Sequence, residues 1–205
     1  PEKNSDIYDY YWISRNQLLV FSQKLGIPTE IFTTTNRLSR FTPAEYVEVY
    51  DLLPDTQDKL IIKDTDRSEK FFNLQLHNLQ SGSLKTVAKN PGHIISWYTD
   101  KDGVIRIRLW VDENEDDRFE YRTNDESPWK EIHPGTDSFG ILFLDEPEKI
   151  IAFVRPKGEA HVIGRYFDCS QNVEYGTPII DPEYDVIPDQ YMVDPENEST
   201  FGFSY

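Results

Sequence analysis

The sequence has little cysteine and no long apolar run. Cys169 is the only cysteine among 205 residues, which excludes an internal disulfide and leaves the compartment open between cytoplasm, periplasm and secretion. Cys169 follows Tyr166, Phe167 and Asp168 at the end of a predicted strand, so we expect a small buried residue and not a catalytic thiol. No apolar stretch approaches the ~18 residues of a membrane span, and no signal-peptide pattern is found.

Positive charge is also scarce. Lys and Arg number 21 against 37 Asp and Glu, a formal net charge of −16 at pH 7. A field of this sign repels phosphate backbones and anionic lipid headgroups. We therefore expect no nucleic-acid partner and no membrane partner. Because the chain begins with Pro1 and its only methionine is Met192, we also expect Pro1 not to be the translation start.

Motifs for catalysis and for metal or nucleotide binding are missing. The segment nearest to G-x-S-x-G, residues 135–140, has one residue too many before Ser138, so Ser138 is predicted to be a loop residue. There is no Walker A motif, no G-x-G-x-x-G and no C-x-x-C. The histidines share no H-x-x-H or H-E-x-x-H spacing and are predicted to be strand or turn residues: His77, His93, His133 and His161. We predict no catalytic, cofactor-binding or metal-binding residue and no cofactor.

A repeated pattern of short strands and turns fills this chain instead. Residues 91–132 are typical: an apolar run ends at Trp97, and a turn at residues 99–103 contains the Asp102-Gly103 pair that suits a tight hairpin. Apolar residues then alternate with polar residues and Trp110 over 105–111, the period of a strand with one apolar face. Two more strands follow, over 118–122 and 129–132. Four antiparallel strands of this size form one β-propeller blade.

Two series of turns repeat with one period. The turn between the first two strands recurs at residues 54–58, 99–103, 145–148 and 194–197, and the turn between the third and fourth strands at 81–82, 125–126 and 171–172. The first-series markers Asp55, Lys101, Glu146 and Glu196 are 46, 45 and 50 residues apart. This spacing lies within the roughly 40 to 50 residues of a propeller blade.

The predicted fold is all-β, a partial β-propeller of about four four-stranded antiparallel blades. A lead-in segment covers residues 1–9, and the propeller covers 10–205, with blades at about 10–43, 44–90, 91–135 and 138–180 and the start of a fifth at 184–205. The remaining predicted strands are 8–14, 17–22 and 29–35; 46–53, 59–63, 71–77 and 83–88; 139–144, 149–155, 159–168 and 173–175. Residues 150–154 are apolar on both faces, so both must be covered, as between stacked blades. The fifth unit ends at its second strand, near Tyr205.

Two clusters have a functional and a structural interpretation. The acidic residues 112–117 offer oxygens to calcium but lack the glycine and spacing of a calcium loop, which favours a solvated hairpin tip. Asp100, Asp102 and Gly103 likewise fit a turn. The aromatic residues could stack on a sugar or peptide, or they could fill the space between blades, which we favour: Trp97, Trp110, Trp129, Tyr98 and Tyr121.

A family resemblance rests on residues 79–106. These residues fit a D-x-x-T-G-type hairpin followed by N-P-G-x-x-x-x-W-x-x-D-x-D-G-x-x-R, with Asn90, Trp97, Asp100 and Arg106 at the defining positions. This resembles the β-propeller of the bacterial prolyl oligopeptidase family of serine peptidases, in its acylaminoacyl-peptidase and dipeptidyl-aminopeptidase-like branch. Residues 128–132, 181–186 and 202–205 add further matches, so the similarity extends from about Trp12 to the end of the chain.

The resemblance implies a non-catalytic propeller segment that gates the entry of peptide substrates. In that family the propeller caps an α/β-hydrolase domain that carries the Ser-Asp-His triad. No position here matches the triad, so the chain alone is not expected to be an enzyme, whereas its parent is expected to be a serine peptidase. The hydrolase domain and further blades would then lie C-terminal to Tyr205, and uncovered blade faces would favour self-association. The alternatives are a stand-alone propeller for protein–protein interaction and a carbohydrate- or calcium-binding β domain.

Overall fold

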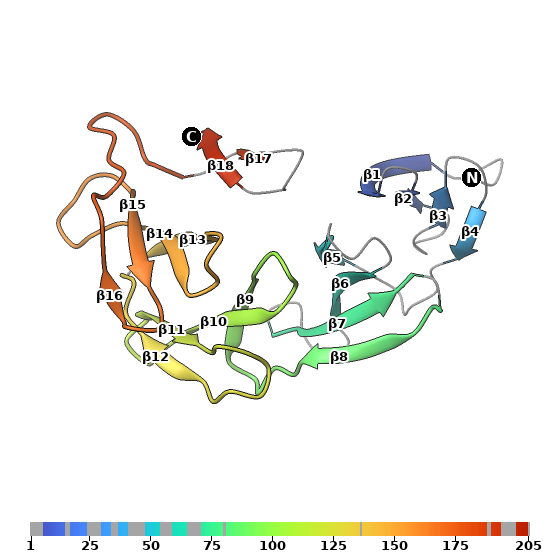
Figure 1. Cartoon of the computed structure of the whole chain (residues 1–205), viewed down its shortest axis with the longest axis horizontal. Helices are drawn as coiled ribbons and strands as arrows, with labels where there is room; N and C mark the ends of the chain where they lie inside the picture. The colour runs from blue at the N-terminus through green and yellow to red at the C-terminus, as the bar shows by residue number, and fades with distance from the viewer. Residues whose placement is uncertain are drawn as a thin grey trace. The chain divides into compact units, whose positions relative to one another are not determined.

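Antiparallel β-strands form every regular element in the described part of the chain (Figure 1). The computed structural model describes residues 6–14, 17–23, 30–33, 37–40, 48–53, 59–64, 71–79, 81–135, 137–187, 190–193 and 200–204. The strands are β1 (Asp6–Ser14), β2 (Gln17–Gln23), β3 (Glu30–Thr33), β4 (Arg37–Arg40), β5 (Glu48–Asp51), β6 (Lys59–Asp64), β7 (Asn73–Asn78), β8 (Leu84–Ala88), β9 (Ile94–Thr99), β10 (Ile105–Val111), β11 (Asp117–Tyr121), β12 (Lys130–Ile132), β13 (Ser138–Phe143), β14 (Lys149–Val154), β15 (Ile163–Asp168), β16 (Val173–Glu174), β17 (Gln190–Val193) and β18 (Thr200–Ser204). Within these residues no helix could cross a bilayer.

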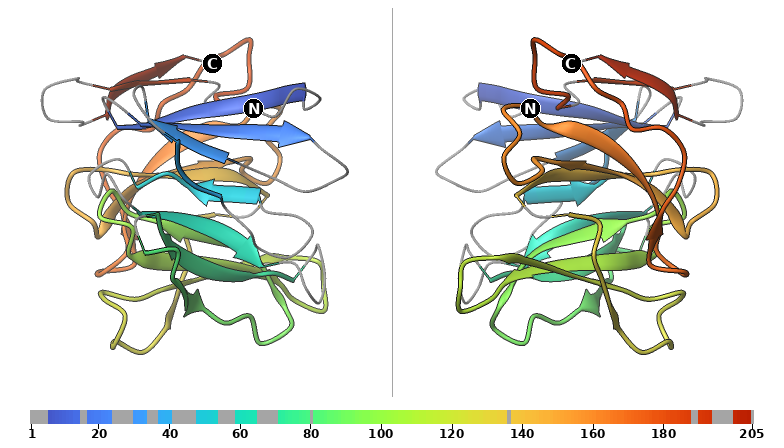
Figure 2. Two further views of the ribbon diagram at one scale, coloured as in Figure 1. Left: turned by 90° about the vertical axis from the view of Figure 1, so that its right-hand side faces the viewer. Right: turned by 90° about the vertical axis from the view of Figure 1, so that its left-hand side faces the viewer.

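The strands form four sheets of four strands and one of two. Their orders are β1-β2-β3-β4, β5-β6-β7-β8, β9-β10-β11-β12 and β13-β14-β15-β16, followed by β17-β18. Within each sheet, every strand pairs with the next one along the chain, and all of these pairs are antiparallel. The first sheet can be followed in blue in Figure 2. The all-β prediction, with four-stranded antiparallel sheets as the repeating element, is confirmed.

The chain divides into two compact units, which we describe separately. One comprises residues 1–93 and 101–103, and the other comprises residues 94–100 and 104–205. The first unit contains the sheets β1–β4 and β5–β8. The second contains the sheets β9–β12 and β13–β16 and the pair β17–β18.

Strand β10 shows how the sequence pattern becomes a sheet with two different faces. Ile105, Ile107 and Leu109 are buried, and the residues between them are only half-buried. The preceding turn is the hairpin predicted from the Asp102-Gly103 pair, and Gly103 has φ +75°, a value that glycine adopts without steric cost. The amide of Asp100 donates to the carbonyl of Val104 at 3.0 Å, which closes the turn.

One apolar core lies between the sheets β9–β12 and β13–β16. It contains, from both sheets and the turn that follows β15, Ile107, Leu109, Phe119, Tyr121, Ile132, Ile150, Ala152, Val154, Phe167 and Cys169. Phe119 and Phe167 are each only 1% exposed. The two sheets therefore stack face to face, because neither could bury these side chains alone.

A second core covers the other face of the sheet β13–β16. It consists of Ile151, Phe153, Val162 and Val186. The segment after β16 reaches this face, where the amide of Val186 donates to the carbonyl of Val162 at 3.0 Å. Strand β14 alternates between the two cores, and its residues 150–154 are all at most 5% exposed. The prediction that this strand is covered on both faces is confirmed.

Several strand boundaries differ from the prediction. Strand β1 starts at Asp6, so residues 6–9 belong to it and not to the lead-in segment. Strand β4, a fourth strand in the first sheet, was not predicted. Strand β15 begins at Ile163 instead of residue 159, because the amide of Glu159 donates to the carbonyl of Pro156 at 3.0 Å and closes a turn there.

The predicted turns are found wherever the structure describes them. Residues 99–103 and 145–148 join the first two strands of their sheets, and residues 81–82, 125–126 and 171–172 join the third and fourth. The turns at 54–58 and 194–197 lie outside the described residues.

Candidate functional site

Cys169 follows β15 and is 3% exposed. Burial, with the nearby carboxylates of Asp168 and Glu148, raises the pKa of its thiol to about 12. Because the thiolate is the nucleophilic form, we expect this thiol to react slowly at neutral pH. The prediction of a buried residue is confirmed.

Ser138 is the first residue of β13, so its prediction as a loop residue was wrong. Its amide donates to Oδ2 of Asp117 at 2.8 Å, which ties β13 to the start of β11 in the neighbouring sheet. Its hydroxyl is buried and bonds to no group among the described residues. In particular, no histidine of the described residues is bonded to this hydroxyl.

The four histidines are scattered. His77 is buried at the end of β7, and burial lowers the pKa of its imidazole. His93 and His133 are exposed next to strand ends, while His161 is half-buried, with Nδ1 3.6 Å from Oδ1 of Asp185. Within the described residues no three His, Cys, Asp or Glu side chains are grouped as metal ligands would be.

The acidic segment 112–117 is a hairpin tip between β10 and β11. Asp112 accepts hydrogen bonds from the amides of Asn114 and Asp116 and forms an ion pair of 2.6 Å with Nη2 of Arg118. The hydrogen bond from Arg118, more than any other contact, lowers the pKa of Asp112. The oxygens of Asp112 are thus bonded within the hairpin itself.

The carboxylate of Asp100 is likewise bonded within its own hairpin. Asp100 is 4% exposed, accepts the amide of Val104 at 2.9 Å and pairs with Nε of Arg106. These contacts join the two strands that flank the turn. Two of the residues that carry the family resemblance, Asp100 and Arg106, therefore stabilise a hairpin.

The five aromatic residues do not form one platform. Tyr121 is buried in the core between the two sheets, and Tyr98 packs against that core. Trp97 lies opposite Arg108 on the other face, with its ring 6.4 Å from that of Trp129. Tyr98 and Tyr121 thus fill the space between two sheets, as favoured, and no single stacking platform forms, because alternate strand positions point to opposite faces of a sheet.

The ring of Trp129 is covered by arginines. The guanidinium carbons of Arg108 and Arg122 lie 4.5 and 4.6 Å from its centroid, within the range of a cation–π contact. Arg122 also donates to the carbonyl of Ile105 at 2.8 Å. The arginines are therefore engaged in holding the strands of this sheet together.

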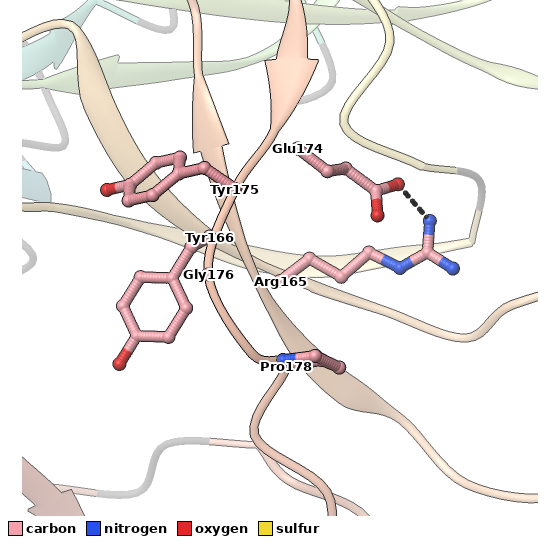
Figure 3. Close-up of a pocket in the computed structure, with 6 residues that line it drawn as sticks. All are labelled: Arg165, Tyr166, Glu174, Tyr175, Gly176 and Pro178. Atoms are coloured by element: carbon pink, nitrogen blue, oxygen red, sulfur yellow. Dashed lines mark hydrogen bonds and ion pairs between the residues drawn. The ribbon is translucent and has the colours of Figure 1, made fainter.

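A pocket of about 90 Å³ lies at the outer edge of the sheet β13–β16, where the chain leaves β16 (Figure 3). Its lining residues are Arg165, Tyr166, Glu174, Tyr175, Gly176 and Pro178. Arg165 and Glu174 point toward each other on one side of the strand, joined by a bond of 2.6 Å, and the two tyrosines lie on the other side (Figure 3). The pocket is large enough for only a few water molecules. Its side chains do not converge on a common point, so we assign no chemistry to it.

A more distinctive surface lies at the end of the sheet where β14 stops. Ser138, Val154 and Ile163 are paired side by side, so the loops that flank them share this end. The exposed residues there include Phe139, 42% exposed, and Tyr184, 65% exposed. We call the group Phe139, Arg155, His161, Tyr184 and Asp185 the aromatic end surface.

Asp185 links the segments that form the aromatic end surface. It accepts the amide of Val162 at 2.7 Å and lies 3.4 Å from Nη2 of Arg155. The Val162 hydrogen bond and the charges of Arg155 and His161 lower the pKa of its carboxyl group. The guanidinium carbon of Arg155 in turn lies 4.9 Å from the centroid of Phe139. This group could not be predicted from the sequence, because Arg155 and Asp185 are 30 residues apart and belong to no local motif.

Comparison with known proteins identifies solved structures with a similar fold. No family model and no curated protein matches the chain. Among solved structures, the β-propeller domain of the Trilobed protease from Pyrococcus furiosus is similar, with a TM-score of 0.50 and 13% sequence identity over 92% of this chain. A eukaryotic initiation factor (TM-score 0.47, 16% identity, 93% of this chain and 46% of that one) and the tricorn protease (0.45, 11%, 83% and 17%) were also found.

The likeness to the Trilobed protease domain shows the fold alone. The repeated four-stranded sheets and this likeness define the chain as all-β with the fold of a partial β-propeller, as predicted. The chain spans 60% of the length of that domain.

Proposed function

We propose that the chain is the non-catalytic, substrate-gating propeller segment of a serine peptidase of the prolyl oligopeptidase family, in its acylaminoacyl-peptidase and dipeptidyl-aminopeptidase-like branch. The main support is that the motif of residues 90–106 coincides with one hairpin, β9–β10, of a repeated four-stranded sheet. A β-propeller domain of a protease has a similar fold. In this proposal an α/β-hydrolase domain of the same protein carries the catalytic triad.

The contacts made by the motif residues support a scaffold role. Oδ1 of Asn90 accepts the amide of Gly92 at 2.9 Å, and the amide of Asn90 donates to Oδ1 of Asn73 at 2.8 Å. Asp100 and Arg106 hold the next hairpin. These residues determine the path of the backbone, so the motif fits a domain whose contribution is shape and not bond chemistry.

Each sheet would be one blade in this proposal. The blades span about 10–43, 44–90, 91–135 and 138–180, and residues from 184 onward begin a fifth. Stacking of the third and fourth sheets through a shared core supports this division. Gating then follows if such blades enclose a passage that admits peptides and excludes folded proteins. Self-association of the isolated chain stays a prediction.

The test is the reading frame that contains this chain, followed by assays of its full-length product. We expect a G-x-S-x-G motif with later Asp and His residues downstream, and covalent labelling by a fluorophosphonate probe. The full-length protein should hydrolyse short peptide esters and amides. It should leave intact a folded protein that contains the same peptide sequences. A stop codon directly after Tyr205, or failure of the probe to label, would reject the peptidase assignment.

A stand-alone interaction module is the second candidate. It is favoured by the exposed rings of Phe139 and Tyr184 at one end of a sheet, because exposed apolar groups rimmed by polar residues mark interaction surfaces. The same reading frame decides between the two candidates, since this one requires no hydrolase domain.

A further inference from the structure

The aromatic end surface has two exposed rings, and acidic residues outnumber basic ones among the exposed residues beside it. Phe139 and Tyr184 are 42% and 65% exposed, although large apolar side chains at such exposure are costly to keep in water. Arg155 links the two segments that carry these rings, because its guanidinium lies against Phe139 and binds Asp185, the neighbour of Tyr184. Phe139 and Tyr184 therefore belong to the same end of the sheet.

The charges around the aromatic end surface indicate which kind of partner it can bind. Arg155 and Asp185 neutralise each other, and the exposed residues nearby are Asp137, Glu159 and Glu183 against Lys157. With the net charge of −16, this surface repels anions and also a second copy of the chain. The faces of aromatic rings attract cations, as the position of Arg155 over Phe139 already shows.

We propose that the aromatic end surface binds a basic polypeptide segment in which lysine or arginine residues alternate with apolar ones. The cationic side chains of this segment pair with Asp137, Glu159 and Glu183, and its apolar side chains cover Phe139 and Tyr184. This proposal does not depend on the peptidase assignment, because it concerns a docking surface and not a reaction.

The opposite end of the same sheet provides an internal control. The loop between β13 and β14 carries the exposed acids Asp145 and Glu146, and Lys149 pairs with Glu146 at 2.7 Å. The exposed large apolar residue at this end, among those described, is Val173 of β16, which has no ring. Both ends of the sheet are thus acidic, but among the described residues the exposed rings lie at the first end, whereas Tyr175, beside Lys149 at the opposite end, is half-buried. If charge alone decided, a basic peptide would bind both ends equally.

The experiment measures binding of a short dye-labelled peptide of lysine, leucine and glycine to the 205-residue chain by fluorescence anisotropy. A peptide with glutamate in place of lysine and one with glycine in place of leucine serve as comparisons. We expect binding of the lysine-leucine peptide only, and a loss of affinity between about 0.1 and 1 M salt as the Debye length falls from about 10 to 3 Å.

Variants then locate the site. The double variant Phe139→Ala, Tyr184→Ala should weaken binding at least tenfold, a difference of about 1.4 kcal/mol, and Glu183→Lys should weaken it severalfold. Tyr184→Phe keeps the ring and should bind like the wild type. Asp145→Lys and Val173→Ala at the opposite end should change the affinity less than twofold.

Hydrogen exchange gives an independent location and a check on folding. The bound peptide should slow exchange of amides in residues 155–162 and 180–187, and each variant should retain the exchange pattern of its core strands. The proposal is overturned if the peptide does not bind, if the glutamate peptide binds equally well, if Asp145→Lys weakens binding as much as Glu183→Lys, or if protection falls on residues 144–149 and 168–173.

Discussion

Phe167 tests the stacking of the sheets β9–β12 and β13–β16. Its ring is 1% exposed in the core that these two sheets share. Truncation to alanine removes the ring and leaves a cavity that packed strands cannot fill, so we expect Phe167→Ala to lower the free energy of unfolding by about 3–5 kcal/mol. Urea denaturation followed by tryptophan fluorescence measures this loss.

Two other phenylalanines of the same sheet serve as controls. Phe139 is 42% exposed, so Phe139→Ala should cost only about 0.5–1 kcal/mol, mainly through its contact with Arg155. Phe153 is fully buried in the core on the other face. Phe153→Ala should therefore cost about as much as Phe167→Ala, about 3–5 kcal/mol, but disturb different neighbours.

Hydrogen exchange distinguishes the two buried sites. Phe167→Ala should accelerate exchange in β10 and β11 as well as in β14 and β15, because its core joins both sheets. Phe153→Ala should act on β13–β16 and on the segment near Val186. A loss below about 1 kcal/mol for Phe167→Ala, or unchanged exchange in β10 and β11, would refute the shared core.

Three further predictions concern single groups. The Cys169 thiol, with its pKa raised to about 12, should react with a disulfide reagent at neutral pH only after unfolding in urea; reaction of the native chain at the rate of a free thiol would contradict its burial. Because the pKa of Asp112 is lowered below 3.8 by Arg118, its contribution to stability is present at neutral pH and is lost as the pH falls through the folded-state value. Asp112→Asn should thus be less stable than the wild type at pH 7 and equal to it in strong acid, as thermal melts would show, whereas a constant difference would exclude the ion pair. Gly82 has φ +70° with open space around it, so Gly82→Ala should cost about 1–2 kcal/mol through the backbone alone and Gly82→Asn less; an equal cost for both would contradict the left-handed turn.

The sequence was sufficient to predict local features of the fold. Alternation over 105–111 predicted β10 and its buried face, and the Asp102-Gly103 pair predicted the turn before it. The unbroken apolar run 150–154 predicted a strand covered on both sides. In each case the evidence lies within a few neighbouring residues, where strand period and turn geometry act directly.

Features set by distant contacts were not predictable in this way. Strand β15 starts late because the residues before it form a turn, after which the amide of Val162 is bound by Asp185, 23 residues further on. The aromatic end surface depends on the same carboxylate. The aromatic residues likewise divide between the two faces of one sheet, with Tyr98 and Tyr121 on one side and Trp97 and Trp129 on the other.

The double burial of β14 also has a consequence for the unfolded chain. Residues 150–154 form a continuous run of high β-propensity without charge, which pairs readily with identical segments of other chains when it is exposed. Lys149 and Arg155 flank the run on both sides, in the position of charged gatekeepers that oppose such stacking. Neutralising both residues should therefore raise the tendency to form amyloid during refolding far more than it lowers native stability.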